Sequence, residues 1–214
     1  MPNLNHATGD KERVTRVKKA FSGLTEAVDR AQAIYGPFDT WFEGLSTAAE
    51  KSERLGKRTT EFMKISKDCG LETDAGCVTS GQSNVPDGYY IGRVLYDSSD
   101  YYKVTSADGM SIIFIANVDD GYLKQIVVDI DGPNKGSFTE GKDLFAFQVD
   151  SENQLIPYNP PSDGIWSWSY IVYAKAFTSW ILDFDNADYL KANSSGKCND
   201  SDIVLDGTTN TSCH

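Results

Sequence analysis

The stretch that decides the fold is Ile126 to Tyr158, with the sequence IVVDIDGPNKGSFTEGKDLFAFQVDSENQLIPY. Apolar residues alternate at 126, 128 and 130, which is typical of a β-strand with one buried face. The turn-forming run GPNKG follows, and a second alternating segment spans Asp143 to Val149. Leu155 to Pro157 then completes the unit. The stretch therefore predicts short antiparallel strands joined by polar loops.

The preceding segment extends this pattern. Asp-Gly pairs at 87–88, 108–109 and 120–121 are typical hairpin turns. They delimit three strands, which we predict at Tyr101 to Thr105, Met110 to Asn117 and Tyr122 to Asp131, the last of which contains residues 126–130. The second is apolar on both faces and should be central, whereas the first alternates and should lie at an edge. With residues 143–149, the chain predicts four consecutive antiparallel strands.

The N-terminal part is predicted to be helical. Asp10 to Tyr35 carries apolar residues at alternating spacings of three and four, which favours one helix. These residues are Val14, Val17, Phe21, Leu24, Val28, Ala31 and Tyr35. Leu45 to Lys67 should form a second helix, although Gly56 is a weak helix former. Tyr170 to Phe184 fits either a helix or a strand, and residues 188–191 a short turn or helix.

This order predicts an α+β fold, with the N-terminal helix packed on a four-stranded antiparallel meander, a second helix and disulfide-closed loops. We expect one domain over residues 1–214. Its helical part spans 10–68, a disulfide loop 69–86, the sheet with its closing segment 87–192, and a disulfide-closed tail 193–214.

Charge and histidine content exclude some functions. The net charge is −11, and residues 69–214 hold 8 Lys and Arg against 21 Asp and Glu. Such an acidic body argues against binding nucleic-acid phosphates. The two histidines, His6 and His214, lie at the ends of the chain, so the interior lacks the commonest general base. We expect no enzymatic activity and no cofactor, apart from a calcium ion considered below.

The four cysteines form two local pairs, Cys69 with Cys77 and Cys198 with Cys213. Three connectivities are possible, and four free thiols are the alternative. The local pairing closes the shortest loops and is our prediction, which implies an oxidising, extracytoplasmic compartment. Met1 to Asp10 lacks the apolar segment of an export signal. We therefore expect the natural protein to begin upstream of this sequence.

Several segments resemble the globular domain of type IV pilins and type II secretion pseudopilins. The likeness covers residues 101–191 and occurs in the same order along the chain. The segments are ADGMSIIF at 107–114, VDIDGPNKG at 128–136, GKDLFAF at 141–147, TSWIL at 178–182 and NADYLK at 186–191. Some relatives carry a cysteine just before the fourth segment, where this chain has Phe177.

The resemblance implies a non-enzymatic structural subunit of a pilus or pseudopilus. It would be anchored in the inner membrane by a hydrophobic N-terminal helix, assemble with other such subunits, and work in the periplasm or at the bacterial cell surface. The resemblance leaves open whether the subunit takes part in secretion, adhesion, motility or DNA uptake. The expected assembly residues are Val14, Val17, Phe21, Leu24 and Val28, of which the first three should be less buried than the last two.

Two acidic groups are candidate cation sites. Asp129, Asp131 and Asn134 have the spacing D-x-D-x-x-N of a calcium loop, with Glu140 or Asp143 as its distal acid. The second group is a cluster near the C-terminus, formed by Asp183, Asp185, Asn186 and Asp188. Both fit solvated turns as well, because acidic residues favour turns for backbone reasons.

Aromatic residues suggest an alternative function. Trp166, Trp168, Tyr170 and Tyr173 could form a sugar-stacking patch on a secreted carbohydrate-binding or adhesin module. The same residues would otherwise cover the sheet or a helix, as large aromatic side chains usually do.

Overall fold

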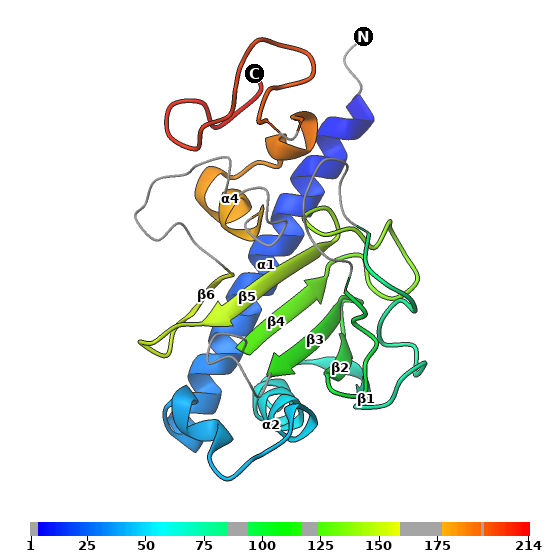
Figure 1. The fold of residues 1–214 in the computed structure, drawn as a ribbon, viewed down its shortest axis with the longest axis vertical. Helices are drawn as coiled ribbons and strands as arrows, with labels where there is room; N and C mark the ends of the chain where they lie inside the picture. The colour runs from blue at the N-terminus through cyan, green and yellow to red at the C-terminus, as the bar shows by residue number, and fades with distance from the viewer. Residues whose placement is uncertain (1–3, 85–93, 117–123, 159–176, 194) are drawn as a thin grey trace.

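The computed structural model describes residues 4–84, 94–116, 124–158, 177–193 and 195–214. The fold is α+β, as predicted, with helices on one face of an antiparallel sheet (Figure 1). The helices are α1 (Leu4–Tyr35), η1 (Phe38–Phe42), α2 (Ala48–Thr60), α4 (Phe177–Phe184) and η3 (Asp188–Lys191). The strands are β1 (Ile65–Gly70), β2 (Tyr102–Ser106), β3 (Ser111–Ala116), β4 (Lys124–Asp129), β5 (Leu144–Val149) and β6 (Leu155–Pro157).

The described strands form one sheet of six, in the order β1-β2-β3-β4-β5-β6. The four predicted strands correspond to β2 through β5, so the expectation of a four-stranded sheet was wrong in number. β1 adds to one side and β6 to the other. β2 was predicted to be an edge strand, but it is internal because Lys67 of β1 pairs with Thr105. β3 is buried along its whole length and central, as predicted.

The second helix is shorter than predicted at both ends. It begins at a capping box, in which Thr47 Oγ1 accepts a hydrogen bond from Glu50 N and Glu50 Oε2 accepts one from Thr47 N. It ends where Met63 N donates to Thr60 O, a turn tighter than α-helical. The next residues pair with β2, which explains why 65–67 are strand rather than helix, although Ser66, Lys67 and Asp68 are all exposed.

The helices cover the inner face of the sheet. The long helix α1 lies across it, and α2 packs at the lower end in Figure 1. The buried residues on α1 include Leu24, Ala27, Val28 and Ala31, and they meet the inward residues of β2 to β5. The chain turns after Tyr35 at Gly36, whose φ of 82° is unfavourable for other residues.

The N-terminal half of α1 is more buried than expected. Val14 is 6% exposed and Val17 is fully buried, so the predicted contrast with Leu24 and Val28 was wrong; only Phe21 is half-buried. The cause is the closing segment, because α4 packs on α1 and η3 lies at the same end of the helix. Lys18 of α1 forms an ion pair with Asp185, just past α4, at 2.6 Å.

Loops cover the outer face of the sheet. Ile113, Ile115 and Val127 point toward this face and pack with Leu144 and Ala146. The covering residues are Cys69 of β1 together with residues of the loops after β1 and after β4, which include Cys77, Val78, Tyr96 and Phe138. The sheet is therefore buried on both sides, and the first disulfide belongs to its outer layer.

Candidate functional site

The most unusual polar group in the described chain is a cluster of three carboxyl groups where β4 ends and β5 begins. Asp129 is the last residue of β4 and pairs with Leu144, the first of β5. Ile130 N donates to Asp143 O at 2.9 Å, which extends the pairing by one step. The sheet thus fixes Asp129 and Asp143 on adjacent strand ends, and Asp131 follows in the loop.

Asp129 is fully buried. Its Oδ1 atom accepts hydrogen bonds from Asp131 N at 3.1 Å and from Gly132 N at 3.3 Å. Its Oδ2 atom is buried and has no hydrogen-bond partner among the described atoms. Burial, together with the nearby negative charge of Asp143, raises the pKa of Asp129 to about 8. The neutral, protonated form of this carboxyl group is therefore favoured at neutral pH.

Asp143 and Asp131 converge over Gly136. The Oδ2 atom of Asp143 accepts hydrogen bonds from Ser137 N at 2.8 Å, Ser137 Oγ at 2.6 Å and Thr139 N at 3.2 Å. A β-carbon built on Gly136 would lie 2.5 Å from Asp131 Oδ2 and 3.2 Å from Asp143 Cγ. Burial and then the adjacent Asp143 raise the pKa of Asp131. The two carboxyl groups therefore share a small space that a side chain at 136 would fill.

Two arginines of α1 stand beside the cluster, and their charges lower the pKa of Asp131 against the larger effects of burial and Asp143. Arg16 Nη1 lies 3.6 Å from Asp131 Oδ1, while it donates to Ile130 O at 2.6 Å. Arg13 Nε donates to Lys142 O at 2.8 Å. A cavity of about 190 Å³ lies between this part of α1 and the loop, lined by Gly9, Glu12, Arg13, Arg16, Ile130, Asp131 and Lys142.

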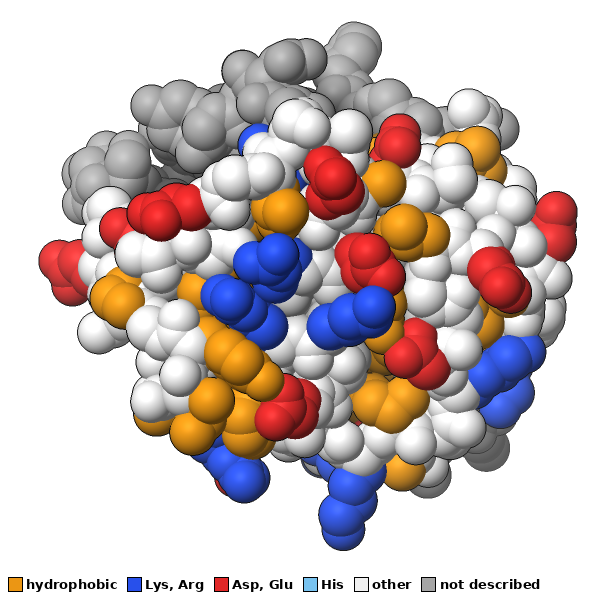
Figure 2. Space-filling view, turned by 90° about the horizontal axis from the view of Figure 1, so that it is seen from below, with side chains coloured by type: hydrophobic (Ala, Val, Ile, Leu, Met, Phe, Trp, Pro, Cys, Tyr) orange, Lys and Arg blue, Asp and Glu red, His pale blue; other side chains and the backbone are white. Residues whose placement is uncertain are grey.

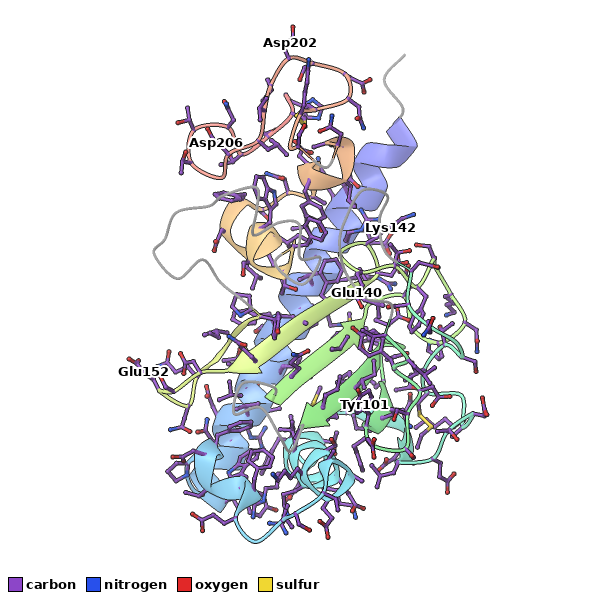
Figure 3. The ribbon with its side chains drawn as sticks, in the orientation of Figure 1. Tyr101, Glu140, Lys142, Glu152, Asp202 and Asp206 are labelled. Carbon is purple, nitrogen blue, oxygen red and sulfur yellow. A yellow bond between two sulfur atoms is a disulfide. The ribbon has the colours of Figure 1, made fainter. Side chains whose placement is uncertain are left out.

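The structure separates the predicted calcium-loop residues. Asn134 has an exposed side chain, and its backbone N–H donates to Thr79 Oγ1 at 2.9 Å. Glu140 turns away from the cluster and accepts a hydrogen bond from Tyr96 Oη at 2.6 Å. Of the two candidate distal acids, Asp143 is therefore the one beside Asp131. Figure 3 shows Glu140 and Lys142 in the loop that leads into β5.

Sequence reasoning missed Ser137, which holds the carboxyl group of Asp143, and Gly136, which leaves space for the carboxyl groups of Asp131 and Asp143. A serine six residues before an aspartate is no distinctive signal, and a glycine in a loop is common. Within the ranges that the structure describes, no three His, Cys, Asp or Glu side chains are arranged to hold a metal ion as they stand.

The second acidic cluster serves as a structural junction. Asp188 Oδ1 accepts from Lys191 Nζ at 2.6 Å, and its Oδ2 accepts from Ser212 Oγ at 2.7 Å and Cys213 N at 2.8 Å. Lys191 Nζ also lies 3.3 Å from Asp10 Oδ2. Asp188 therefore ties η3 to the C-terminal tail and, through Lys191, to α1.

Its neighbours have separate partners. Asn186 Oδ1 accepts from Trp180 Nε1 at 3.0 Å, and Asp185 pairs with Lys18. Asp202 and Asp206 lie farther out on the tail, at its upper end in Figure 3.

Two disulfides join Cys69 to Cys77 and Cys198 to Cys213, which is the local pairing that the spacing predicts. Disulfides persist in oxidising compartments, so this pairing indicates an extracytoplasmic environment. The aromatic residues considered for sugar binding, Trp166, Trp168, Tyr170 and Tyr173, lie outside the described residues.

Comparisons with protein-family models, with curated proteins and with solved structures found no match. Among the helices that the structure describes, none combines the length and the apolar character needed to cross a membrane.

Proposed function

We propose that this chain is a structural subunit of a pilus or pseudopilus and has no enzymatic activity. It would assemble with other subunits through α1 and a hydrophobic helix continuous with it, after anchoring in the inner membrane. Its working place would be the periplasm or the bacterial cell surface. The sequence resemblance between residues 101 and 191 motivates the proposal.

The observation that carries the proposal is that α1 is buried on one face and exposed on the opposite face. At 1.5 Å per residue, its 32 residues span about 48 Å. One face is buried on the sheet through Leu24 and Val28. The opposite stripe is exposed and includes Ser22, Glu26, Asp29 and Ala33. A long helix with one face left uncovered along a domain is a ready contact surface for the helices of neighbouring subunits.

The surface at the α2 end is compatible with contacts between like subunits. Viewed from below, Lys and Arg side chains alternate with Asp, Glu and hydrophobic side chains (Figure 2). A mixed surface of this kind avoids the repulsion that two copies of a strongly single-sign face would meet.

The test uses the full natural gene in its bacterium and compares two charge reversals. Asp29→Lys changes the exposed face of α1, and Asp100→Lys changes an equally exposed acid on the loop before β2. We expect Asp29→Lys to reduce surface filaments several-fold in immunogold electron microscopy, and Asp100→Lys to leave them at wild-type number. Thermal unfolding of both purified proteins should match wild type, which excludes a folding defect.

The proposal fails if antibodies against this chain label no filament or envelope assembly. It also fails if the reading frame upstream encodes no apolar segment of about 20 residues, the length that spans a bilayer.

A further inference from the structure

We propose that the exposed stripe of α1 is a self-complementary surface through which two copies of this chain pair with their α1 helices antiparallel. The proposal goes beyond the filament role and does not rest on it, because pairing can be measured on the purified chain whether or not filaments form. The stripe consists of exposed residues that recur at helical spacing, namely Lys19, Gly23, Glu26, Arg30 and Ala33, with Ile34 on its flank.

The first argument is a cavity of about 490 Å³ on one flank of this stripe. Its walls include Ala20, Gly23 and Leu24 of α1, and Phe62, Met63 and Met110 from other elements. A β-carbon built on Gly23 would have no described heavy atom within 4 Å outside its own helix backbone. The space beside Gly23 is therefore open to an apolar side chain from a second molecule.

Ile34 is the side chain that matches this cavity. It is 66% exposed, more than Leu95 and Val204, the other large hydrophobic residues that the described part of the chain exposes. Ile34 lies on the same flank of α1 as the cavity, about three helical turns or about 16 Å beyond Gly23. At that distance it cannot fill the cavity of its own chain, but it can fill that of a second copy.

The second argument is the pattern of charge along the stripe. A two-fold axis level with Val28 places Glu26 opposite the partner's Arg30, and Arg30 opposite the partner's Glu26. The same axis brings Ile34 level with the partner's Gly23, at the cavity. Each favourable contact then forms twice, as in any isologous pair. Parallel helices in register would instead place like charges opposite each other, which disfavours pairing.

The groups on the stripe are free to make these contacts. Within one chain, Arg30 Nη1 lies 3.5 Å from Glu26 Oε1, and the two side chains are 58% and 72% exposed. An exposed pair of this kind contributes little to stability, so exchanging it for a contact between chains costs little. Gly23 and Ala33 carry small side chains or none, which lets two helix axes approach closely.

A two-fold pair is closed, because each copy uses the whole of its surface. It covers the same stripe of α1 through which we propose filament contacts. A paired subunit is therefore unavailable to a filament, and pairing keeps free subunits from assembling.

The first experiment measures the dissociation constant of the pair by sedimentation equilibrium at about 0.15 M NaCl, which screens the repulsion between two chains of net charge −11. The variants are Glu26→Arg, Arg30→Glu, the double reversal that carries both changes, and Ile34→Asp. The matched control is Leu95→Asp, which alters an exposed hydrophobic residue away from α1. Thermal unfolding of each protein verifies that it is folded.

We expect the wild type to form dimers and no larger species as its concentration rises. Each single charge reversal should raise the dissociation constant at least about tenfold, because it places like charges opposite each other twice. The double reversal should return it to within about threefold of wild type, since the two sites are coupled. Ile34→Asp should also weaken the dimer at least about tenfold, and Leu95→Asp should leave it unchanged.

The second experiment determines the orientation by disulfide trapping. Chains that carry only Ser22→Cys are mixed with chains that carry only Ile34→Cys and are oxidised mildly, while the native cysteines remain paired. Antiparallel helices should cross-link the mixture far more than either variant alone.

The proposal is overturned if the wild type stays monomeric at about 1 mM, where even a millimolar dissociation constant would show dimers. It is also overturned if the double reversal does not recover pairing, or if Ile34→Asp and Leu95→Asp have the same effect. Cross-linking of each single-cysteine variant with itself, as strong as that of the mixture, would contradict the antiparallel arrangement.

Discussion

Gly56 of α2 lies directly against the ring of Tyr102 in β2. A β-carbon built at Gly56 would be 2.1 Å from Tyr102 Cδ1 and 2.5 Å from Cγ. The sequence shows a weak helix former in the middle of a helix, and the structure supplies the reason, since only glycine allows α2 to approach the sheet this closely. Tyr102 is itself buried, and its hydroxyl donates to Asp68 at 2.6 Å, so the ring cannot easily move.

Alanine at position 56 should therefore destabilise the protein. Its better helix propensity contributes about 1 kcal/mol, but overpacking against a fixed ring costs about 1–3 kcal/mol. We expect a lower free energy of unfolding in urea denaturation. Gly23→Ala is the matched control, because Gly23 is helical and no described heavy atom would lie within 4 Å of the new carbon. That variant should be more stable by about 0.5–1 kcal/mol. Changes of the same sign in both variants would contradict the close approach.

The burial of both halves of α1 leads to a second prediction, which concerns the free energy of unfolding. Leu24→Ala should lower the free energy of unfolding by about 2–5 kcal/mol. Val17→Ala removes two buried methyl groups and should cost about 1–3 kcal/mol. Ser22→Ala, on the exposed face, should change it by less than about 0.5 kcal/mol. Urea denaturation of the three variants measures this. A Val17→Ala change as small as that of Ser22→Ala would mean that α4 and η3 do not cover the N-terminal half in solution.

The second disulfide should contribute substantially to stability. Cys198 and Cys213 are 15 residues apart, and a loop of that size is worth about 3 kcal/mol in the chain-entropy view. Replacing both cysteines by serine should lower the free energy of unfolding by about that amount. Thiol titration of the unfolded, unreduced wild type should find no free thiol. Two or more free thiols would contradict the pairing, and an unchanged stability would mean that the tail is held mainly by Asp188.

The predictions that the structure confirmed came from local sequence patterns. Alternation in residues 126–130 and 143–149 predicted β4 and β5, and spacing predicted both disulfide pairs. These features depend on neighbours in the chain. β1 could not be predicted from its own residues, because it alternates weakly and becomes a strand only by pairing with β2. The elements that cover α1 include α4, which begins more than 160 residues after Val14.

The candidate cation site, too, could be predicted from the sequence only in part. The sequence named Asp129 and Asp131 from their spacing and left Glu140 and Asp143 as alternatives. Choosing between the two alternatives required knowing that Tyr96, on a distant loop, binds Glu140. That Oδ2 of Asp129 has no hydrogen-bond partner among the described atoms follows from packing alone, and no feature of the sequence indicates it.

The last prediction concerns acid stability and Asp188, which is 4% exposed. Burial alone would raise the pKa of Asp188, but hydrogen bonds from Lys191, Ser212 and Cys213 N–H outweigh it and lower the pKa below its ordinary value of 3.8. A carboxyl group whose pKa is lower in the folded state stabilises the protein above its unfolded pKa and loses this contribution as the pH falls through the folded value. The stabilisation by Asp188 should thus be complete at neutral pH and decline below about pH 4.

Asp188→Asn should lower the free energy of unfolding at pH 7 by about 1–3 kcal/mol, because it weakens charge-assisted hydrogen bonds to Lys191 and to the tail. The loss should shrink as the pH falls below about 4, since the wild-type carboxyl is then protonated as well. Urea denaturation of both proteins at several pH values gives the two curves. Asp100→Asn, at an exposed site, should run parallel to wild type throughout. An Asp188→Asn curve that also runs parallel to wild type would show that the tail is held at η3 without the charge of this carboxylate.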